Sequence, residues 1–171
     1  MHKTTMYAML VVVGFGLVAA NSDTWGAEKS GWYSAKAGDM AKYKIMGGMT
    51  QTTEVTKVDE NFVYVSISMM MGSQTISTQQ QKMPKYQNAG AAPNVEGPKP
   101  EIKDLGTEMV EISGKKLTCR VTETKMEAEG RTITSKVWIS GDVPGGMVRM
   151  MSDAMGKMDV QLELVDFRRG S

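Results

Sequence analysis

Residues Phe62–Met71, with the sequence FVYVSISMMM, restrict what this chain can fold into. Alternate residues from Val63 onward are valine, isoleucine or methionine, and those from Phe62 onward are mostly aromatic residues or serine. A period of two among β-branched and aromatic residues predicts a β-strand. Because apolar residues stand on both sides, we expect the second side either to be covered by the chain or to form a binding surface.

Similar segments recur along the chain, separated by turns of glycine, aspartate, asparagine and serine. Gly72-Ser73 and Ser113-Gly114 fit two-residue hairpin turns. No internal repeat and no long helix is visible in the sequence. The pattern predicts an all-β meander of antiparallel hairpins, with strands at residues 40–46, 50–58, 62–71, 74–82, 108–112, 116–126, 132–140 and 158–167.

The first 20 residues match the pattern of a secretory signal peptide. Lys3 precedes the uncharged, largely apolar run Tyr7–Ala20, which ends in small residues at the positions expected before a cleavage site. A second candidate cleavage site lies near Ala27. The run is shorter than the ~20 residues that cross a bilayer. We therefore expect an exported protein, periplasmic or extracellular, with no stable membrane anchor after cleavage.

Residues 28–171 are expected to form one antiparallel β domain, since ~145 residues match an ordinary domain. Segment 84–103 contains four of the five prolines together with several glycines, which predicts a long surface loop. The parts on either side would have only ~60 residues each, too few for a partial sheet to bury its own face. A single domain is therefore the better interpretation.

The composition argues against nucleic-acid binding, histidine-dependent chemistry and an intramolecular disulfide. The chain has 20 basic and 19 acidic residues, scattered along its length, so we expect no nucleic-acid partner. The only histidine, His2, lies in the signal segment, which removes the commonest general base and metal ligand from the mature protein. The only cysteine, Cys119, cannot form an intramolecular disulfide. Its position between Leu117 and Val121 predicts a buried, unreactive thiol.

Methionine is frequent, with 17 residues in the chain. Thioether sulfur is a soft ligand that suits Cu(I), so a Cu(I) site is one interpretation. It requires the methionines near the C-terminus to converge in space. The alternative is packing, because a hairpin with its turn near residues 153–157 would divide these side chains between two faces. The cluster consists of Met147, Met150, Met151, Met155 and Met158; further groups are Met69–Met71 and the pair Met46 and Met49.

No catalytic, cofactor-binding or metal-ligating residue can be assigned from the sequence. It has no nucleophile elbow, phosphate-binding loop, EF-hand or paired-cysteine motif. We therefore expect a protein without enzymatic activity and without a cofactor. The carboxylates without diagnostic spacing are Asp39, Glu108, Glu123 and Asp166. Single aromatic residues fit core packing better than a ligand groove; those concerned are Trp138, Tyr43 and Tyr64.

Four segments together resemble a pattern in exported bacterial β-proteins of unknown function. They are GDMAKYKI (38–45), GTEMVEISGKKLTC (106–119), KVWIS (136–140) and VPGGMVR (143–149). In that pattern a G-x-E strand, a single cysteine, a W-x-S segment and a V-P-G-G segment follow in order. The sequence is also similar to the half-barrels of periplasmic lipoprotein carriers. This resemblance implies one curved antiparallel sheet, a half-barrel or open barrel with at most one short helix, whose concave face holds an apolar ligand.

We therefore expect an exported, non-enzymatic β-protein. Its partner would be an apolar small molecule or lipid, or another protein of the cell envelope. Two alternatives stay open at this point. One is Cu(I) handling through the methionine clusters, and the other is a purely structural role in the envelope.

Overall fold

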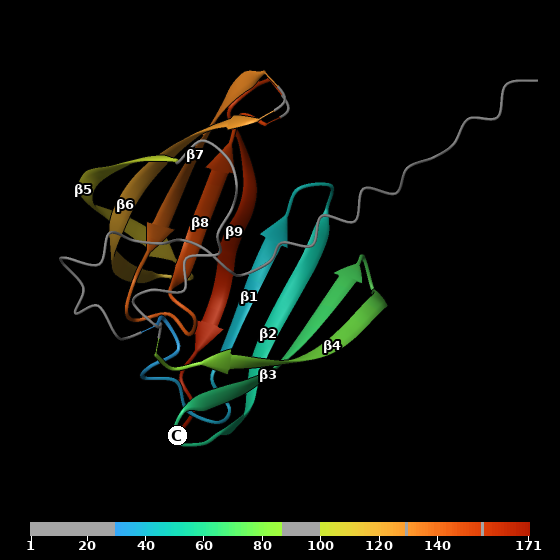
Figure 1. Cartoon of the computed structure of the whole chain (residues 1–171). Helices are drawn as coiled ribbons and strands as arrows, with labels where there is room; N and C mark the ends of the chain where they lie inside the picture. The colour runs from blue at the N-terminus through green and yellow to red at the C-terminus, as the bar shows by residue number, and fades with distance from the viewer. Residues whose placement is uncertain (1–29, 87–99, 129, 155) are drawn as a thin grey trace, which may run out of the picture.

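The described part of the chain forms one antiparallel β-sheet (Figure 1). The computed structural model describes residues 30–86, 100–128, 130–154 and 156–171, so the predicted signal peptide lies outside the described residues. None of these residues is helical, which confirms the all-β prediction, and no membrane-spanning helix occurs among them. The strands are β1 (Met40–Ile45), β2 (Met49–Val58), β3 (Phe62–Met71), β4 (Gln74–Pro84), β5 (Glu101–Ile112), β6 (Lys115–Ala128), β7 (Arg131–Ile139), β8 (Met147–Ser152) and β9 (Asp159–Arg168).

The strand order leaves the sheet open. Strands β1 to β4 form one meander and β5 to β9 form another. β1 pairs with β9, which joins the two meanders into the order β4-β3-β2-β1-β9-β8-β7-β6-β5. Among the described strands, β4 and β5 are the edges and do not pair with each other. Figure 1 shows that the sheet is strongly curved, so the prediction of one curved, open antiparallel sheet is confirmed.

Most predicted strands and turns are present. Ser113 and Gly114 have φ angles of 48° and 75°, as a type I′ hairpin turn requires. The predicted loop at 84–103 is shorter at both ends, because β4 includes Pro84 and β5 begins at Glu101. Its interior, residues 87–99, lies outside the described residues. β5 therefore begins well before the strand predicted at 108–112.

Strand register divides the sheet into two faces, because residues paired directly across neighbouring strands share a face. Leu164, Tyr43, Gln51 and Met69 pair in succession across β9, β1, β2 and β3. We name this side the Tyr43 face. The other side is named the Cys119 face, after the buried thiol on β6.

The two halves of the sheet are packed differently. The larger core lies mainly in the C-terminal half and combines residues from both faces, including Leu117, Cys119, Trp138, Leu162 and Leu164 together with Tyr43 of β1. The N-terminal half has a smaller core on the Tyr43 face, formed by Val55, Val63 and Val65 together with Trp32 and Ala35 from the preceding turns. Full burial of one such aliphatic side chain contributes about 1.5–3 kcal/mol. Both cores therefore stabilise the curved sheet.

The V-P-G-G segment connects the two cores. Val143 and Pro144 are fully buried in the loop between β7 and β8. Gly145 lies against the ring of Trp32, and a Cβ at this position would be 2.7 Å from the ring atom Cζ2. Its φ angle of 79° also favours glycine. The glycine therefore allows the N-terminal turns to pack against the β7–β8 loop.

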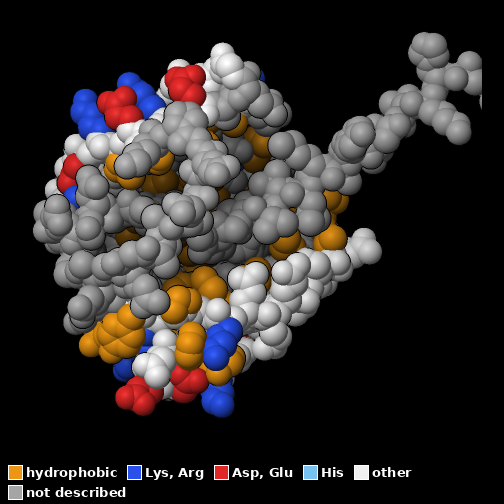
Figure 2. All heavy atoms as spheres, viewed as in Figure 1, with side chains coloured by type: hydrophobic (Ala, Val, Ile, Leu, Met, Phe, Trp, Pro, Cys, Tyr) orange, Lys and Arg blue, Asp and Glu red, His pale blue; other side chains and the backbone are white. Residues whose placement is uncertain are grey.

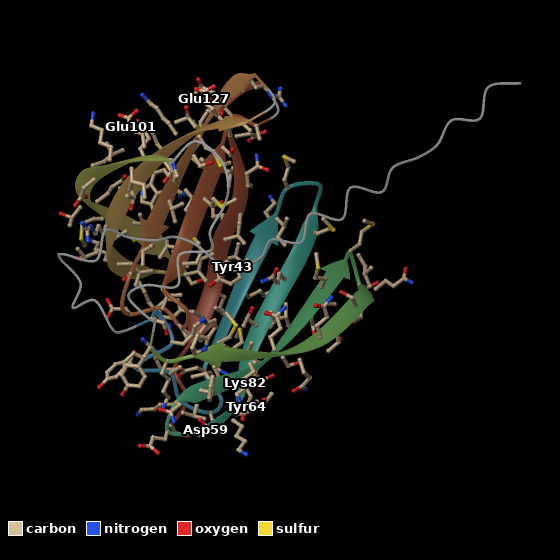
Figure 3. All side chains as sticks on the ribbon, in the orientation of Figure 1. Tyr43, Asp59, Tyr64, Lys82, Glu101 and Glu127 are labelled. Atoms are coloured by element: carbon tan, nitrogen blue, oxygen red, sulfur yellow. The ribbon has the colours of Figure 1, made fainter. Side chains whose placement is uncertain are left out.

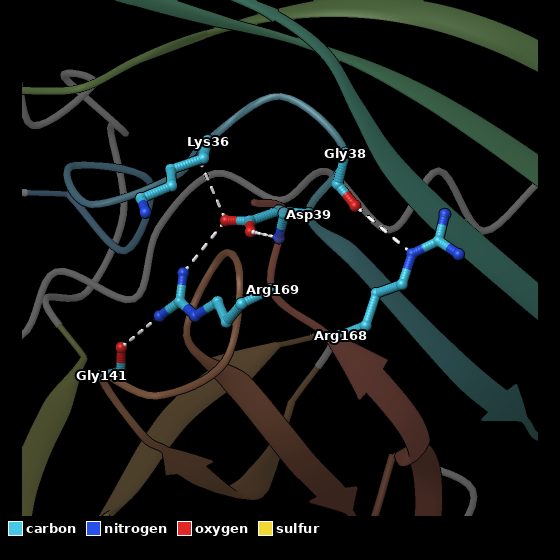
Figure 4. A network of polar contacts seen from close by, with 7 residues as sticks. Lys36, Gly38, Asp39, Gly141, Arg168 and Arg169 are labelled. Carbon is cyan, nitrogen blue, oxygen red and sulfur yellow. Dashed lines mark hydrogen bonds and ion pairs between the residues drawn. The ribbon is translucent and has the colours of Figure 1, made fainter.

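A polar network near this loop joins residues 36–39, near the start of the described chain, to residues 169–170, near its end (Figure 4). The carboxylate of Asp39 is fully buried and accepts hydrogen bonds from the backbone N–H of Lys36 at 3.0 Å and of Gly170 at 2.6 Å. Arg169 donates to the same carboxylate at 3.1 Å and to the carbonyl of Gly141 at 2.8 Å. We name this network the Asp39 clasp.

Candidate binding face

The Tyr43 face of β1 to β4 carries no charged side chain among the described residues. An antiparallel sheet normally places its charges on the solvated side, so this face is suited to apolar contact. Across β2, β3 and β4 its members include Met49, Gln51, Thr53, Val55, Val63, Val65, Ile67, Met69, Met71, Ser77, Gln79, Gln81 and Met83. The opposite side of β1 to β4 carries Lys42, Lys44, Glu54, Lys57 and Lys82.

Burial decreases along this face from one end of β3 to the other. Val63 and Val65 are fully buried, Ile67 and Met69 are half-buried, and Met71 is 56% exposed. The apolar surface therefore continues beyond the part that the chain covers. Figure 2 shows separate patches of hydrophobic side chains, with most of the visible acidic and basic groups toward the upper and lower ends of the molecule.

A small hollow lies at the covered end of the face. Its enclosed volume is about 10 Å³, roughly the space of one water molecule. An acyl chain does not fit inside a hollow of this size. An apolar ligand would therefore contact the half-exposed surface of β2 to β4. The hollow is lined by Trp32, Tyr43, Thr53, Val65, Ile67 and Met83.

The buried polar residues Tyr43 and Gln51 of this face make contacts within the protein. The Tyr43 hydroxyl donates a hydrogen bond to the carbonyl of Met147 at 3.2 Å. Burial raises the pKa of the Tyr43 phenol, so this side chain is neutral at physiological pH. Gln51 donates from Nε2 to Oγ1 of Thr53 at 3.4 Å, and both residues are buried. On β2 and β3 the exposed part of the face therefore offers mainly apolar contacts, whereas β4 adds the exposed side chains of Gln79 and Gln81.

Lysine side chains cover the opposite side of β3. Nζ of Lys82 lies 3.7 Å from the ring centroid of Phe62, and Nζ of Lys57 lies 5.4 Å from that of Tyr64. The Tyr64 hydroxyl donates to Asp59 at 3.1 Å, and Figure 3 shows Asp59, Tyr64 and Lys82 together at one end of the molecule. Cations over aromatic rings stabilise such surfaces. The aromatic residues on this side of β3 thus have internal partners, whereas its Tyr43 face is only partly covered.

Strand β8 places Met150 and Met151, two of the methionines that the Cu(I) hypothesis required to converge, on opposite faces, although Met147, Met150 and Met151 all pack against the larger core. β8 spans Met147–Ser152 and β9 begins at Asp159, which confirms the hairpin. Met150 lies on the Tyr43 face, whereas Met151 lies on the Cys119 face. Met155 lies outside the described residues. The β8–β9 methionines therefore do not share one face.

The other candidate side chains make structural contacts. Cys119 is fully buried, as predicted, and burial raises the pKa of its thiol. Trp138 is also buried and donates from Nε1 to Glu108 at 2.8 Å, while Glu123 lies 3.5 Å from Lys136 in an ion pair. In the described part of the chain, no three histidine, cysteine, aspartate or glutamate residues group closely enough to hold a metal ion. The carboxylates considered from the sequence, Asp39, Glu108, Glu123 and Asp166, therefore form no metal-binding group.

Comparison with solved structures finds two proteins of similar fold. No family model and no curated protein matches the sequence. A solved structure from Bacteroides fragilis, described as an exported protein with a YmcC-like fold, has a TM-score of 0.54 at 11% identity, covering 82% of this chain and 100% of that one. A second, from Parabacteroides distasonis and described as a lipoprotein, has a TM-score of 0.53 at 12% identity, covering 82% and 99%.

This chain shares the fold of those two proteins. At such low identity the likeness shows the fold alone. It agrees with the resemblance to exported β-proteins at the level of architecture. The pattern of G-x-E, cysteine, W-x-S and V-P-G-G stays a prediction.

Three residues that contribute to this face could not be recognised from the sequence. Gln51 and Thr53 are polar residues at buried positions, so the polarity of β2 alone does not reveal which side is covered. Trp32 lies in a turn without periodicity, and its partner Gly145 is distant in the sequence. Only tertiary packing brings these groups to the Tyr43 face.

Proposed function

We propose that this protein is an exported, non-enzymatic β-protein that binds an apolar ligand on the Tyr43 face of β1 to β4. The ligand is a small molecule or lipid, or an apolar surface of another envelope protein. The observation that carries this proposal is the difference between the two faces. One bears lysine and glutamate, whereas the other is uncharged and only half covered along β3. Exposed apolar side chains that gather on one uncharged face typically mark an interaction site.

The half-covered part of the face, which we name the apolar surface, consists of Met49, Ile67, Met69, Met71 and Met83. Methionine side chains are flexible and polarisable, so they adapt to ligands of different shapes. Each apolar side chain that a ligand covers completely contributes about 1.5–3 kcal/mol to burial before the entropy costs of association. A few such contacts are enough for specific binding.

Export is supported by two observations. Residues 1–20 have the pattern of a signal peptide, and the two fold neighbours are described as an exported protein and a lipoprotein. We therefore propose a periplasmic or extracellular location. The absence of any catalytic motif in the sequence supports a non-enzymatic role.

Native mass spectrometry of the protein, purified from its envelope fraction without detergent, tests the small-molecule form. We expect a bound apolar compound that organic solvent releases. Met69→Lys places a charge on the apolar surface, whereas Ser68→Lys places the same charge on the opposite side of β3. Loss of the compound in the first variant alone supports the proposal. Equal retention in both variants contradicts the location.

Photo-cross-linking tests the protein-partner form. A photoreactive amino acid at position 69 faces the apolar surface, and one at position 68 is the matched control on the other side of β3. A single adduct of defined mass from position 69 alone supports a partner on the Tyr43 face. If neither position gives an adduct and no compound is extracted, the alternative of a purely structural envelope component is favoured.

A further inference from the structure

We propose that Met49, Met69 and Met71 form a binding site for a soft monovalent cation, Cu(I) or Ag(I). Met49 on β2 is paired directly with Met71 on β3, and Met69 is the next residue of β3 on the same face. This set is different from the β8–β9 methionines that stand out in the sequence. The pairing of β2 with β3 places these three methionines next to one another.

Strand geometry brings the three sulfur atoms within reach of one ion. Directly opposite residues have Cβ atoms about 4.5–5.5 Å apart, and diagonal neighbours are about 7–8 Å apart or less. A methionine sulfur lies beyond Cγ on a flexible side chain, so three of them can turn toward a common point. Met70 is paired with Thr50 on the opposite side and takes no part. Figure 3 shows several sulfur atoms around this end of β2 and β3.

The surroundings suit a soft ion better than a hard one. Thioether sulfur favours Cu(I), whereas Mg²⁺ and Ca²⁺ need carboxylate or carbonyl oxygen. Met71 is 56% exposed, so an ion can enter from solvent, while Met49 and Met69 are half-buried and partly held by packing. The nearest register neighbours on the Tyr43 face are uncharged, namely Ile45, Gln51, Gln74 and Ser77.

The site overlaps the apolar surface but is tested separately from it. Leucine has nearly the volume of methionine and lacks the sulfur, so Met→Leu variants keep the apolar surface and remove the ligand atoms. Binding of an apolar compound should survive these variants, whereas metal binding should not. If the protein binds no metal at this site, the proposed binding of an apolar ligand is unaffected. If it binds no apolar ligand, the proposed metal site is likewise unaffected.

The test is a titration with Ag(I), the redox-inert substitute for Cu(I), followed by NMR of ¹³C-labelled methionine methyl groups. The protein carries Cys119→Ala, because a thiolate would compete for the metal. We expect the methyl signals of Met49, Met69 and Met71, assigned from single Met→Leu variants, to shift together and saturate at one equivalent. Replacing all three with leucine should weaken Ag(I) binding by about ten-fold or more.

Two exposed methionines on other strands provide the matched control. Met109 is 60% exposed and Met126 is 46% exposed, and the double variant Met109→Leu/Met126→Leu should bind Ag(I) like its parent. Competition with a Cu(I) chelator under anaerobic conditions should give the same order of affinities. The proposal is overturned if no signal saturates, if Met109 and Met126 shift as strongly as the three ligands, or if the triple leucine variant binds as tightly as its parent.

Discussion

Replacing Asp39 with alanine should destabilise the fold strongly, because its buried carboxylate holds both ends of the described chain. The two backbone donors, Lys36 and Gly170, would lose their acceptor. A hydrogen bond to a charged group contributes about 1.5–3 kcal/mol, so the pair accounts for about 3–6 kcal/mol. The ion pair with Arg169 adds less than about 1 kcal/mol, since that side chain is 35% exposed. We expect the free energy of unfolding to fall by about 4 kcal/mol.

Urea unfolding followed by tryptophan fluorescence, with linear extrapolation, measures this loss. The exposed carboxylate of Asp142, in the neighbouring loop, is the control. Asp142→Ala should change the free energy of unfolding by less than about 0.5 kcal/mol. The double variant Asp39→Ala/Arg169→Ala should be less destabilised than the sum of the single variants, because the two side chains interact. A loss below about 1 kcal/mol in Asp39→Ala would show that the buried carboxylate does not stabilise the fold as proposed, since removing a buried acceptor of three hydrogen bonds leaves its donors unsatisfied.

Three further predictions concern other parts of the structure. Gly145→Ala should lower the free energy of unfolding in urea by more than about 1 kcal/mol, because its φ of 79° is left-handed and the new methyl group would meet Trp32. The control, Gly141→Ala, has open space around it and should leave the free energy of unfolding nearly unchanged. The N–H of Phe62 lowers the pKa of Asp59, so the stabilisation from this carboxylate is present above its ordinary pKa and is lost as pH falls through the lower folded value. Asp59→Asn should therefore flatten the acid limb of a stability–pH curve, and an unchanged limb would contradict this. Cys119, buried and with a raised pKa, should react with a thiol reagent only as fast as the protein unfolds, so rapid labelling of the native protein would be inconsistent with the fold.

The strands could be predicted because their pattern is local. The alternation of Phe62–Met71 and the turns at Gly72 and Gly114 are visible within a few residues, and the structure contains them. The pairing of β1 with β9 could not be predicted, because it joins strands from opposite ends of the chain without a local turn. That pairing decides the strand order and leaves β4 and β5 as edges.

The candidate site could be predicted only in part. The sequence showed that β3 is apolar on both sides, but not that lysines cover one side and leave the other partly open. The methionines of β8 stood out because they are close in sequence, yet alternation along the strand divides Met150 from Met151. Met49 and Met71 are distant in sequence and become neighbours only through the register of β2 and β3.

Whether the Tyr43 face is the binding surface is tested directly by placing one charge on either side of β3 and measuring the binding of a neutral apolar fluorescent probe. Ile67→Lys puts the charge on the Tyr43 face, and Ser66→Lys puts it on the opposite side, where Ser66 pairs with Glu54. If the Tyr43 face is the binding surface, the first variant should bind the probe about ten-fold more weakly than the parent, and the second should match the parent. Equal affinities in the two variants, or no saturable binding by the parent protein, would contradict binding on the Tyr43 face.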